Sequence, residues 1–196
     1  MRILHTTSTK EVSDGAKAIV LFSGGLDSTS CVHLLQTKGF EVTGLFVDFG
    51  QLAVEPEKRA VATLKERLAI EVHSIRVTGF CDLSSGELSG RNLLLISAAL
   101  FYSKGLECVI GTGIHAGTGY YDCSQPFLAS VSTLASAQSD GRVSVVAPFA
   151  TWLKRDIYDY ASAEALPITE TYSCERGSVP CCGLCASCQD RKDLRC

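Results

Sequence analysis

The sequence predicts an α/β fold with a doubly wound parallel sheet, followed by a C-terminal four-cysteine zinc knuckle. Short apolar runs rich in β-branched residues alternate with longer helical segments, a pattern typical of parallel sheets that helices cover on both faces. One run, at residues 18–22, leads directly into two glycines and the start of a helix. Six of the ten cysteines fall within residues 174–196, which predicts the metal knuckle.

The elements are assigned from periodicity and from the residues that start and stop helices. Apolar β-branched runs are assigned to buried strands, and longer amphipathic or apolar segments to helices. Gly39 ends the first helix, and Pro56 opens the second, where a backbone N–H has no partner. In chain order we expect a strand at 17–22, a helix at 28–38, a strand at 41–48, a helix at 56–68, a strand at 71–77, a helix at 92–104, a strand at 107–111, a helix at 125–139, a strand at 142–148 and a helix at 152–165.

Two connections stand out by composition. Residues 78–90 carry turn residues and few apolar ones, so we expect a mobile flap there. Residues 111–119 contain four glycines and begin where a strand ends. Open α/β sheets bind ligands at the carboxyl ends of their strands, so this second loop is expected to lie beside a ligand.

Length and composition exclude several classes of protein. A chain of 196 residues with 46% hydrophobic and 20% charged residues fits one domain with a small appendage. We place a nucleotide-binding domain at 1–168 and a zinc-binding segment at 169–196. A formal net charge of −3 gives no broad basic surface for nucleic acid, and no apolar stretch approaches the ~20 residues that span a membrane. The N-terminus lacks the apolar centre of a signal peptide, so we expect a cytoplasmic protein.

The turn after the first strand carries the strongest functional signal. Its two glycines permit a tight turn, and the helix start offers unpaired N–H groups and a positive dipole end to an anion. No Gly-Lys-Ser/Thr follows, which excludes the P-loop of kinases and GTPases. The motif Ser-Gly-Gly-Leu-Asp-Ser, at residues 23–28, instead resembles the pyrophosphate loop of enzymes that split ATP into AMP and pyrophosphate. The alternative is an ordinary glycine-rich turn with a serine helix cap. The residues expected to hold ATP here are Phe22, Ser23, Gly24, Gly25, Leu26, Asp27, Ser28, Thr29 and Ser30.

The C-terminal cysteines have the spacing of a zinc site. Residues 182–188 contain two overlapping C-x-x-C units, which let two sulfurs reach one tetrahedral ion from a tight turn. Gly183 fits that turn, in which backbone N–H groups can face the sulfurs. Cys181 would break the C-x-x-C spacing to Cys185 and is left out. The expected ligands of a structural Zn²⁺ are Cys174, Cys182, Cys185 and Cys188.

Other interpretations of the cysteines remain open. The cluster could hold an iron–sulfur centre, or form a thioredoxin-like redox pair. A redox pair normally opens a helix after a strand, whereas only loop is expected in this segment. Cys31 and Cys108 lie in apolar contexts and are expected to be small buried hydrophobes. The roles of Cys181 and Cys196 stay open.

Taken in order, the motifs resemble one family. The sequence resembles the 7-cyano-7-deazaguanine synthases, ATP-dependent ligases that make the nitrile precursor of queuosine. The likeness runs from about residue 19 to residue 191. Its motifs are Ser-Gly-Gly-Leu-Asp-Ser (23–28), Asp-Phe-Gly-Gln (48–51), Gly-Arg-Asn (90–92), Tyr-Tyr-Asp-Cys (120–123), Thr-Tyr-Ser-Cys (171–174) and Cys-Gly-Leu-Cys-Ala-Ser-Cys (182–188).

The resemblance implies a reaction and its partners. ATP, with Mg²⁺, adenylates the small-molecule substrate 7-carboxy-7-deazaguanine, and ammonia converts it to an amide. A second adenylation activates the amide oxygen, and loss of AMP leaves the nitrile. The family also suggests a homodimer.

The resemblance further implies roles for individual residues. Asp27 and Ser28 would act at the pyrophosphate, with Asp27 near the metal. Asp48 and Gln51 would line the nucleotide or purine pocket. The other two expected catalytic residues are Arg91, as a cation for a phosphate or the substrate carboxylate, and Asp122, as an acceptor for purine N–H groups.

Each of these residues could also have a purely structural role. Asp48 and Asp122 could each be a turn residue, and Arg91 a member of a surface ion pair. Lys154 would either reach a phosphate or lie on a solvated helix face. His115, in the glycine loop, is a weaker catalytic candidate.

Three positions depart from the family pattern. Gly113 and Ala116 stand where the family carries Asn and Asp, and Ser124 stands where it carries Arg. The altered pocket leaves a second interpretation open, a diverged ligase such as those of defence systems, which would join a deazaguanine acid to an amine of an acceptor protein. A non-catalytic zinc-knuckle binding module is the third.

Overall fold

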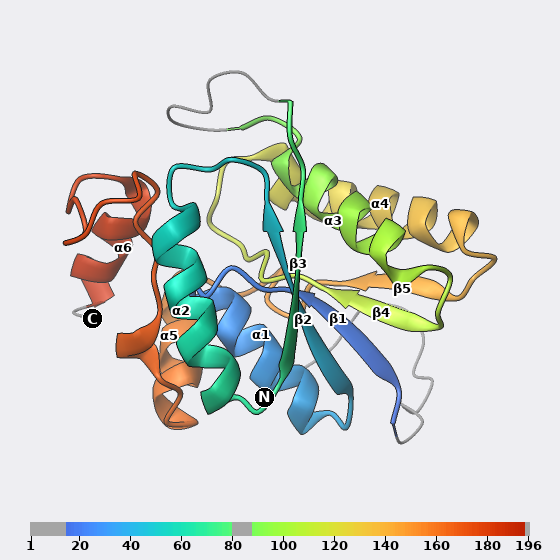
Figure 1. Cartoon of the computed structure of the whole chain (residues 1–196), viewed down its shortest axis with the longest axis horizontal. Coiled ribbons are helices and arrows are strands. Elements are labelled where there is room, and N and C mark those ends of the chain that lie inside the picture. The colour runs from blue at the N-terminus through green and yellow to red at the C-terminus, as the bar shows by residue number, and fades with distance from the viewer. Residues whose placement is uncertain (1–14, 80–87, 195–196) are drawn as a thin grey trace.

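Five parallel strands form the centre of the structure, a computed structural model that describes residues 15–79 and 88–194 (Figure 1). They form one sheet in the order β3-β2-β1-β4-β5. All four pairings are parallel, so the carboxyl ends of the strands lie at one edge. The strands are β1 (Lys17–Leu21), β2 (Glu41–Asp48), β3 (Glu71–Arg76), β4 (Cys108–Gly111) and β5 (Val143–Val146).

Helices cover both faces of this sheet. Helices α1 (Leu26–Thr37), α2 (Val54–Arg67) and α5 (Lys154–Ala163) share one apolar cluster with the sheet, at the lower left of it in Figure 1. Helices α3 (Arg91–Ser103) and α4 (Gln125–Gln138) pack on the opposite face. Three short elements complete the fold: η1 (Tyr121–Cys123), η2 (Ile168–Glu170) and α6 (Ala186–Leu194).

Alternation along β1 assigns its side chains to the two helical layers. Ala18 and Val20 are buried in the cluster with α1, α2 and α5, whereas Ile19 is buried in the cluster with α3 and α4. A strand buried on both faces carries a continuous apolar run, as this one does. The predicted doubly wound parallel sheet is therefore confirmed.

Element boundaries differ from the expected ones by a few residues. Helix α1 starts at Leu26 instead of residue 28, and α2 starts at Val54, two residues before Pro56. Proline is tolerated there because the first-turn N–H groups of a helix have no intrahelical acceptor. Residues 80–87, most of the expected flap at 78–90, lie outside the described residues.

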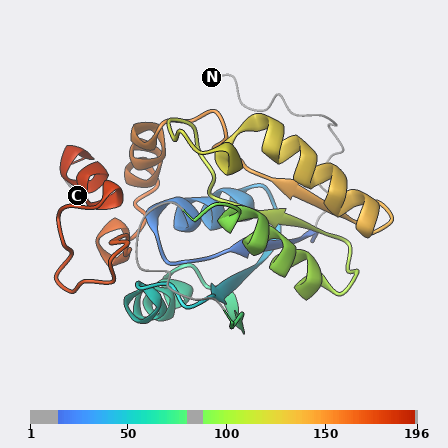
Figure 2. The ribbon, with the colours of Figure 1, turned by 90° about the horizontal axis from the view of Figure 1, so that it is seen from above.

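The expectation of loop throughout the cysteine segment is wrong. Helix α6 begins directly after Cys185 and carries Cys188 in its first turn. Only Cys188 and Leu194 of this nine-residue helix are buried, so the sequence has no apolar periodicity to reveal it. Figures 1 and 2 both place α6 at one end of the molecule beside α5, where Arg155 donates to the Asp193 carbonyl at 3.1 Å.

The topology creates a switch point between β1 and β4. The chain leaves β1 toward one helical layer and reaches β4 from the other, and the loops after these two strands therefore meet. The contact is close at Gly113, where a Cβ atom would lie 2.9 Å from the Asp27 Cβ and 3.1 Å from the Ser28 backbone N. Position 113 therefore has no room for a side chain.

We expect Gly113→Ala to lower the free energy of unfolding by about 1–3 kcal/mol, because backbone atoms of α1 must move to admit the methyl group. Gly119→Ala in the same loop is the matched control, since no atom lies within 4 Å of a Cβ there. Urea denaturation of both variants measures the difference. Equal unfolding midpoints would contradict the contact between the two loops.

Candidate active site and metal centre

The turn between β1 and α1 is fixed by glycine at its second position. Gly24 has φ +77°, and a Cβ there would lie 3.0 Å from both the Ala60 Cβ and the Val61 backbone N of α2. The side chains of Phe22 and Leu26 are buried in the apolar core, so these two residues can offer a ligand only backbone groups. Ser23 is exposed. The turn thus presents backbone N–H groups and one serine hydroxyl at the sheet edge.

Three hydroxyls follow on the first turns of α1. Ser28 Oγ donates to the Gly25 carbonyl at 3.0 Å. The hydroxyls of Thr29 and Ser30 are buried and have no hydrogen-bond partner among the described residues. An unpaired buried hydroxyl costs about 1–3 kcal/mol, which favours a polar ligand or water beside this helix start.

Asp27 is held by a lysine from the last helix of the sheet domain. Lys154 Nζ lies 2.7 Å from Asp27 Oδ1 and 2.6 Å from Oδ2. Both side chains are about one quarter exposed, at 25% and 27%. Lys154 therefore points at the loop and not away on a solvated helix face. Its ammonium also brings a positive charge to the expected phosphate site.

Asp48, at the end of β2, is the centre of a charged network. Its Oδ2 accepts from Lys58 Nζ and Arg76 Nε, each at 3.1 Å, and Oδ1 accepts from the Gly50 N–H at 3.2 Å. Burial alone would raise the pKa of Asp48, but these donors outweigh it and lower that pKa below its ordinary value. Asp48 thus ties β2 to β3 and α2.

Gln51 joins the same turn to Glu57 on α2. Gln51 Nε2 donates to Glu57 Oε2 at 2.8 Å and to the Val47 carbonyl at 3.3 Å. Gln51 Oε1 accepts from the Phe49 N–H at 3.0 Å, which fixes the orientation of the amide. The sequence argument missed Glu57, because a glutamate in the first turn of a charged helix is usually solvated.

Asp122 and Arg91 meet at the start of α3. Asp122 Oδ2 accepts from the Asn92 backbone N–H at 3.1 Å, and Asn92 Nδ2 donates to the Asp122 carbonyl at 3.0 Å. Asp122 thereby caps α3, whose own N-cap, Gly90, has no side chain. Arg91 is exposed at the first position of this helix. The structure thus brings Asp122 and Arg91 together at one helix end.

The departures near the glycine loop have local structural roles. Ser124 Oγ accepts from the Phe127 N–H at 3.3 Å and is the N-cap of α4. The Ala116 N–H donates to the Trp152 carbonyl at 2.8 Å. His115 Nδ1 lies 2.6 Å from the Ala116 carbonyl, so its ring is tied to its own loop.

The four expected metal ligands converge. The sulfurs of Cys174, Cys182, Cys185 and Cys188 all lie within 4.8 Å of one another. Cys182 Sγ and Cys188 Sγ are 3.9 Å apart, close to the ~3.8 Å edge of a tetrahedron with Zn–S bonds of ~2.3 Å. This spacing and an all-sulfur donor set fit Zn²⁺.

Backbone N–H groups also point at the sulfurs. Cys182 Sγ accepts from Leu184 N and Cys185 N, both at 3.4 Å, in the turn that Gly183 makes with φ +69°. Burial raises the pKa of Cys174, but backbone donors, foremost the Cys182 N–H, outweigh it and lower that pKa to about 6. Donors of this kind favour thiolates, the form that binds a metal.

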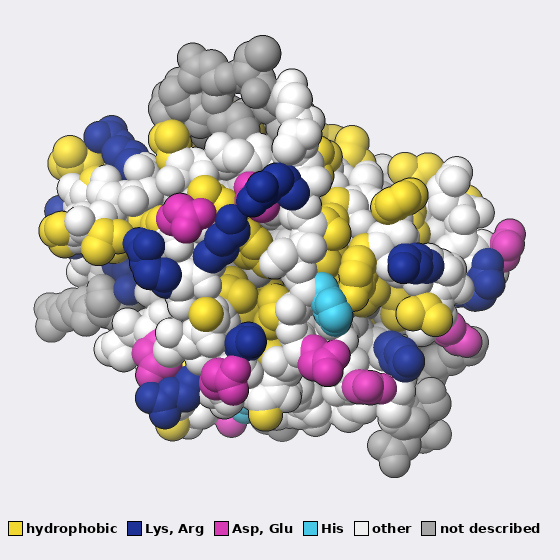
Figure 3. All heavy atoms as spheres, in the orientation of Figure 1, with side chains coloured by type: hydrophobic (Ala, Val, Ile, Leu, Met, Phe, Trp, Pro, Cys, Tyr) yellow, Lys and Arg dark blue, Asp and Glu magenta, His cyan; other side chains and the backbone are white. Residues whose placement is uncertain are grey.

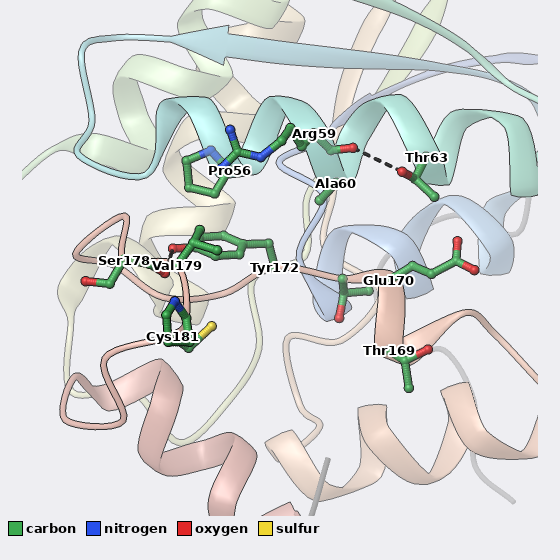
Figure 4. A pocket seen from close by; sticks show the side chains of 12 residues that line it. Pro56, Arg59, Ala60, Thr63, Thr169, Glu170, Tyr172, Ser178, Val179 and Cys181 are labelled. Atoms are coloured by element: carbon green, nitrogen blue, oxygen red, sulfur yellow. Dashed lines mark hydrogen bonds between the residues drawn. The ribbon is translucent and has the colours of Figure 1, made fainter.

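Two cysteines outside the cluster, Cys31 and Cys108, lie as expected, whereas Cys81 and Cys196 fall outside the described residues. Cys31 and Cys108 are buried, and burial raises the pKa of the Cys31 thiol to about 12. Cys181 is exposed and lines a groove between α2 and residues 169–181 (Figure 4). In that groove the Tyr172 hydroxyl donates to the Ser178 carbonyl at 2.9 Å. Cys181 is therefore separate from the four clustered sulfurs.

The cysteine segment contacts the glycine turn directly. The Tyr172 N–H donates to the Gly24 carbonyl at 2.9 Å, two residues before the first clustered cysteine. A Cβ at Gly25 would lie 3.4 Å from the Tyr172 carbonyl oxygen. The strand-like segment at Tyr172 thus forms one wall of the turn.

Known proteins match nearly the whole described chain. A family model described as queuosine biosynthesis protein QueC matches residues 17–89 and 82–194. The chain belongs to the QueC family. The resemblance drawn from the motifs is therefore confirmed.

Named relatives in the QueC family share about the same length. A 7-cyano-7-deazaguanine synthase of Microcystis aeruginosa is 32% identical over 205 residues, covering 89% of each chain. A protein of the same name from Haloarcula marismortui is 27% identical over 209 residues, covering 92% of this chain and 90% of the relative. The likeness thus spans the sheet domain and the cysteine segment.

Two further observations concern the charges on one face of the protein and the length of its helices. The face drawn in Figure 3 carries basic and acidic side chains interspersed, with no continuous basic area. None of the helices in the described part of the chain is long and apolar enough to cross a membrane.

We expect Cys185→Ser to abolish zinc binding and to lower the melting temperature by several degrees, because structural zinc sites contribute on the order of 10 kcal/mol to folding in small zinc-binding domains. Cys181→Ser is the matched control and should keep both zinc and stability. Elemental analysis with thermal unfolding measures both. Equal zinc content in Cys185→Ser and the unmodified protein would exclude this ligand set.

Proposed function

We propose that this chain is an ATP-dependent, AMP-forming carbon–nitrogen ligase that converts 7-carboxy-7-deazaguanine and ammonia to 7-cyano-7-deazaguanine. The observation that carries the proposal is the glycine turn at the switch point, with Lys154 on Asp27 beside it. The names of the relatives supply the product, 7-cyano-7-deazaguanine, and the motif resemblance supplies the acid substrate and ammonia. Residues 1–168 would bind the nucleotide and residues 169–196 the zinc, in a cytoplasmic homodimer. The exposed Phe101, at 88%, would suit a subunit contact.

The reaction needs a leaving group, and neither the carboxylate nor the amide formed from it has one. A carboxylate or amide oxygen does not leave unaided. Transfer of the AMP moiety from ATP to that oxygen, with release of pyrophosphate, makes it part of a phosphate leaving group. Residues 23–30 would hold the pyrophosphate with backbone N–H groups and hydroxyls, which stabilise charge that develops as the bond breaks. Lys154 would move from Asp27 to the phosphates.

Magnesium fits the one carboxylate at this turn. Mg²⁺ in nucleotide sites is bound by one or two carboxylates together with phosphates and water. Asp27 would be its protein ligand, and the ion would neutralise phosphate charge. Ser28 would contact the same phosphates.

The pocket residues have proposed roles that agree with their contacts. Arg91 would meet the substrate carboxylate or a phosphate from the start of α3. Asp122 holds that helix with Oδ2, and its Oδ1, whose one described donor is the Cys123 thiol at 3.9 Å, would accept purine N–H groups. Asp48 and Gln51 would form the wall at the end of β2.

A second candidate function is a diverged ligase that joins the deazaguanine acid to an amine of an acceptor protein. The observation that favours it is the change of three polar or charged side chains of the family pattern, to Gly113, Ala116 and Ser124. Mass spectrometry of a reaction with Mg-ATP, ammonium and 7-carboxy-7-deazaguanine tests both. A nitrile product supports the synthase, and AMP without a nitrile supports the ligase. No ATP consumption would overturn both.

We expect Asp27→Ala to reduce pyrophosphate release at least about 100-fold, because the variant loses the proposed metal ligand and the partner of Lys154. Its fold should persist, because Lys154 is partly exposed, at 25%, and its ammonium can be hydrated once Asp27 is removed. Asp159→Ala, an exposed carboxylate on α5, is the control. A pyrophosphate assay with thermal unfolding measures both effects. Unchanged release in Asp27→Ala would refute the loop assignment.

A further inference from the structure

One carboxylate at the ligand edge of the sheet lacks a cationic partner. Glu57 lies in the first turns of α2, and its backbone carbonyl would be 3.3 Å from a Cβ at Gly24. Its side chain is half-buried and accepts one described hydrogen bond, from Gln51 Nε2 at 2.8 Å. No lysine or arginine of the described residues lies within ion-pair distance of it. The Glu57 backbone thus packs against the glycine turn, and its side chain lies against Gln51, a neutral donor.

The other carboxylates at this edge are engaged. Asp27 is paired with Lys154, Asp48 with Lys58 and Arg76, and Asp122 with the N-terminus of α3. Cations and helix ends stabilise the charged form of a carboxylate and make it a weak base. Glu57 is the carboxylate among these four that is half-buried and has neither a cation nor a helix end as its partner.

The charges around Glu57 come from two neighbouring elements. Arg91 at the start of α3 lies near enough to lower its pKa, and Asp48 at the end of β2 raises it. Burial is the largest influence, and the pKa of Glu57 rises to about 7. Lys58 and Arg76 are turned to Asp48, so they do not neutralise Glu57 directly.

We propose that Glu57 is the general base that takes a proton from the amine nucleophile during amide formation. This inference rests on the proposed ligase function. The nitrogen lone pair forms the C–N bond, the C–O bond to AMP breaks with its electron pair leaving on AMP, and the N–H proton passes to Glu57 Oε1 and then to water. When the nitrile forms, the nitrogen again loses a proton as AMP leaves.

The geometry suits that role. Gln51 holds Glu57 Oε2 and is itself fixed by the Phe49 N–H and the Val47 carbonyl, so Oε1 has a defined direction. A general base is most effective when its pKa is near the working pH, and it contributes about 10²–10⁴-fold to a rate. Asp27 and Lys154, on the other side of the turn, would serve adenylation. The two halves of the reaction thus use different residues.

We expect Glu57→Gln to lower the rate of amide formation about 10²–10⁴-fold and to leave substrate-dependent ATP–pyrophosphate exchange within about twofold of the unmodified protein. The exchange assay reports adenylation alone and also shows that the variant is folded. Glu55→Gln, an exposed residue of the same helix turn, is the matched control and should change neither rate. Hydroxylamine, largely unprotonated at neutral pH, should restore product formation in Glu57→Gln more than ammonia does.

The pH profile gives a second test. The rate of amide formation is divided by the concentration of unprotonated ammonia at each pH. This rate should rise with pH through about 7 and then level off, because only the deprotonated Glu57 accepts a proton. The ATP–pyrophosphate exchange reaction should not show this rise with pH, and neither should amide formation by the Glu57→Gln variant. Gln51→Leu removes a hydrogen-bond donor that favours the charged form of Glu57. The rise in the rate of amide formation should therefore occur at higher pH in this variant.

Two results would overturn the inference. Unimpaired amide formation in Glu57→Gln would show that Glu57 is not the base. Equal loss of exchange and amide formation would assign Glu57 to adenylation or folding. Absence of exchange in the unmodified protein would overturn the proposed ligase function instead, so the two failures are distinguishable.

Discussion

The close approach of backbone segments at the carboxyl edge of the sheet is the constraint on which the candidate site depends. Gly24 packs against α2 and accepts from the Tyr172 N–H, and Gly113 packs against the start of α1. At both glycines the contact distances leave no room for a Cβ. The turn is therefore held from three sides by segments far apart in the sequence. Rigid N–H groups of this kind need little reorganisation to bind an anion.

Charge pairing divides this edge into regions of different chemistry. Lys154 and Asp27 form an ion pair. In the proposed reaction a metal and phosphates would replace it, because each partner carries a charge that one of those ligands complements. Asp48 is locked between two cations and so contributes rigidity. Glu57 keeps a pKa of about 7 because burial and the nearby Asp48 outweigh the Gln51 hydrogen bond and the more distant charge of Arg91. Under the proposals made above, carboxyl groups of the same chemistry would serve structural pairing, metal binding and proton transfer according to their neighbours.

Local patterns predicted most of the fold and the metal cluster, because strands, turns and C-x-x-C spacing act over a few residues. Helix α6 escaped because only two of its residues are buried. The pair of Lys154 with Asp27 joins positions 127 residues apart, and no local pattern records it. Glu57 was missed for another reason. Its hydrogen bond comes from Gln51, and the charges of Asp48 and Arg91 act on it from other elements, so its chemistry exists only in the folded chain.

The structure shows what the residue does at each of the three positions that depart from the family pattern. Gly113 leaves no room for a side chain, Ser124 caps α4, and the backbone of Ala116 is bonded to Trp152. Each residue fits its own position, so none of them is evidence of a damaged loop. Relative to the family pattern, all three positions change a polar or charged side chain, whereas the residues proposed for adenylation are retained. Under the proposed function, these positions could change the choice of acceptor and leave the nucleotide turn intact, because the contact of Gly113 with Asp27 and Ser28 needs no side chain at position 113.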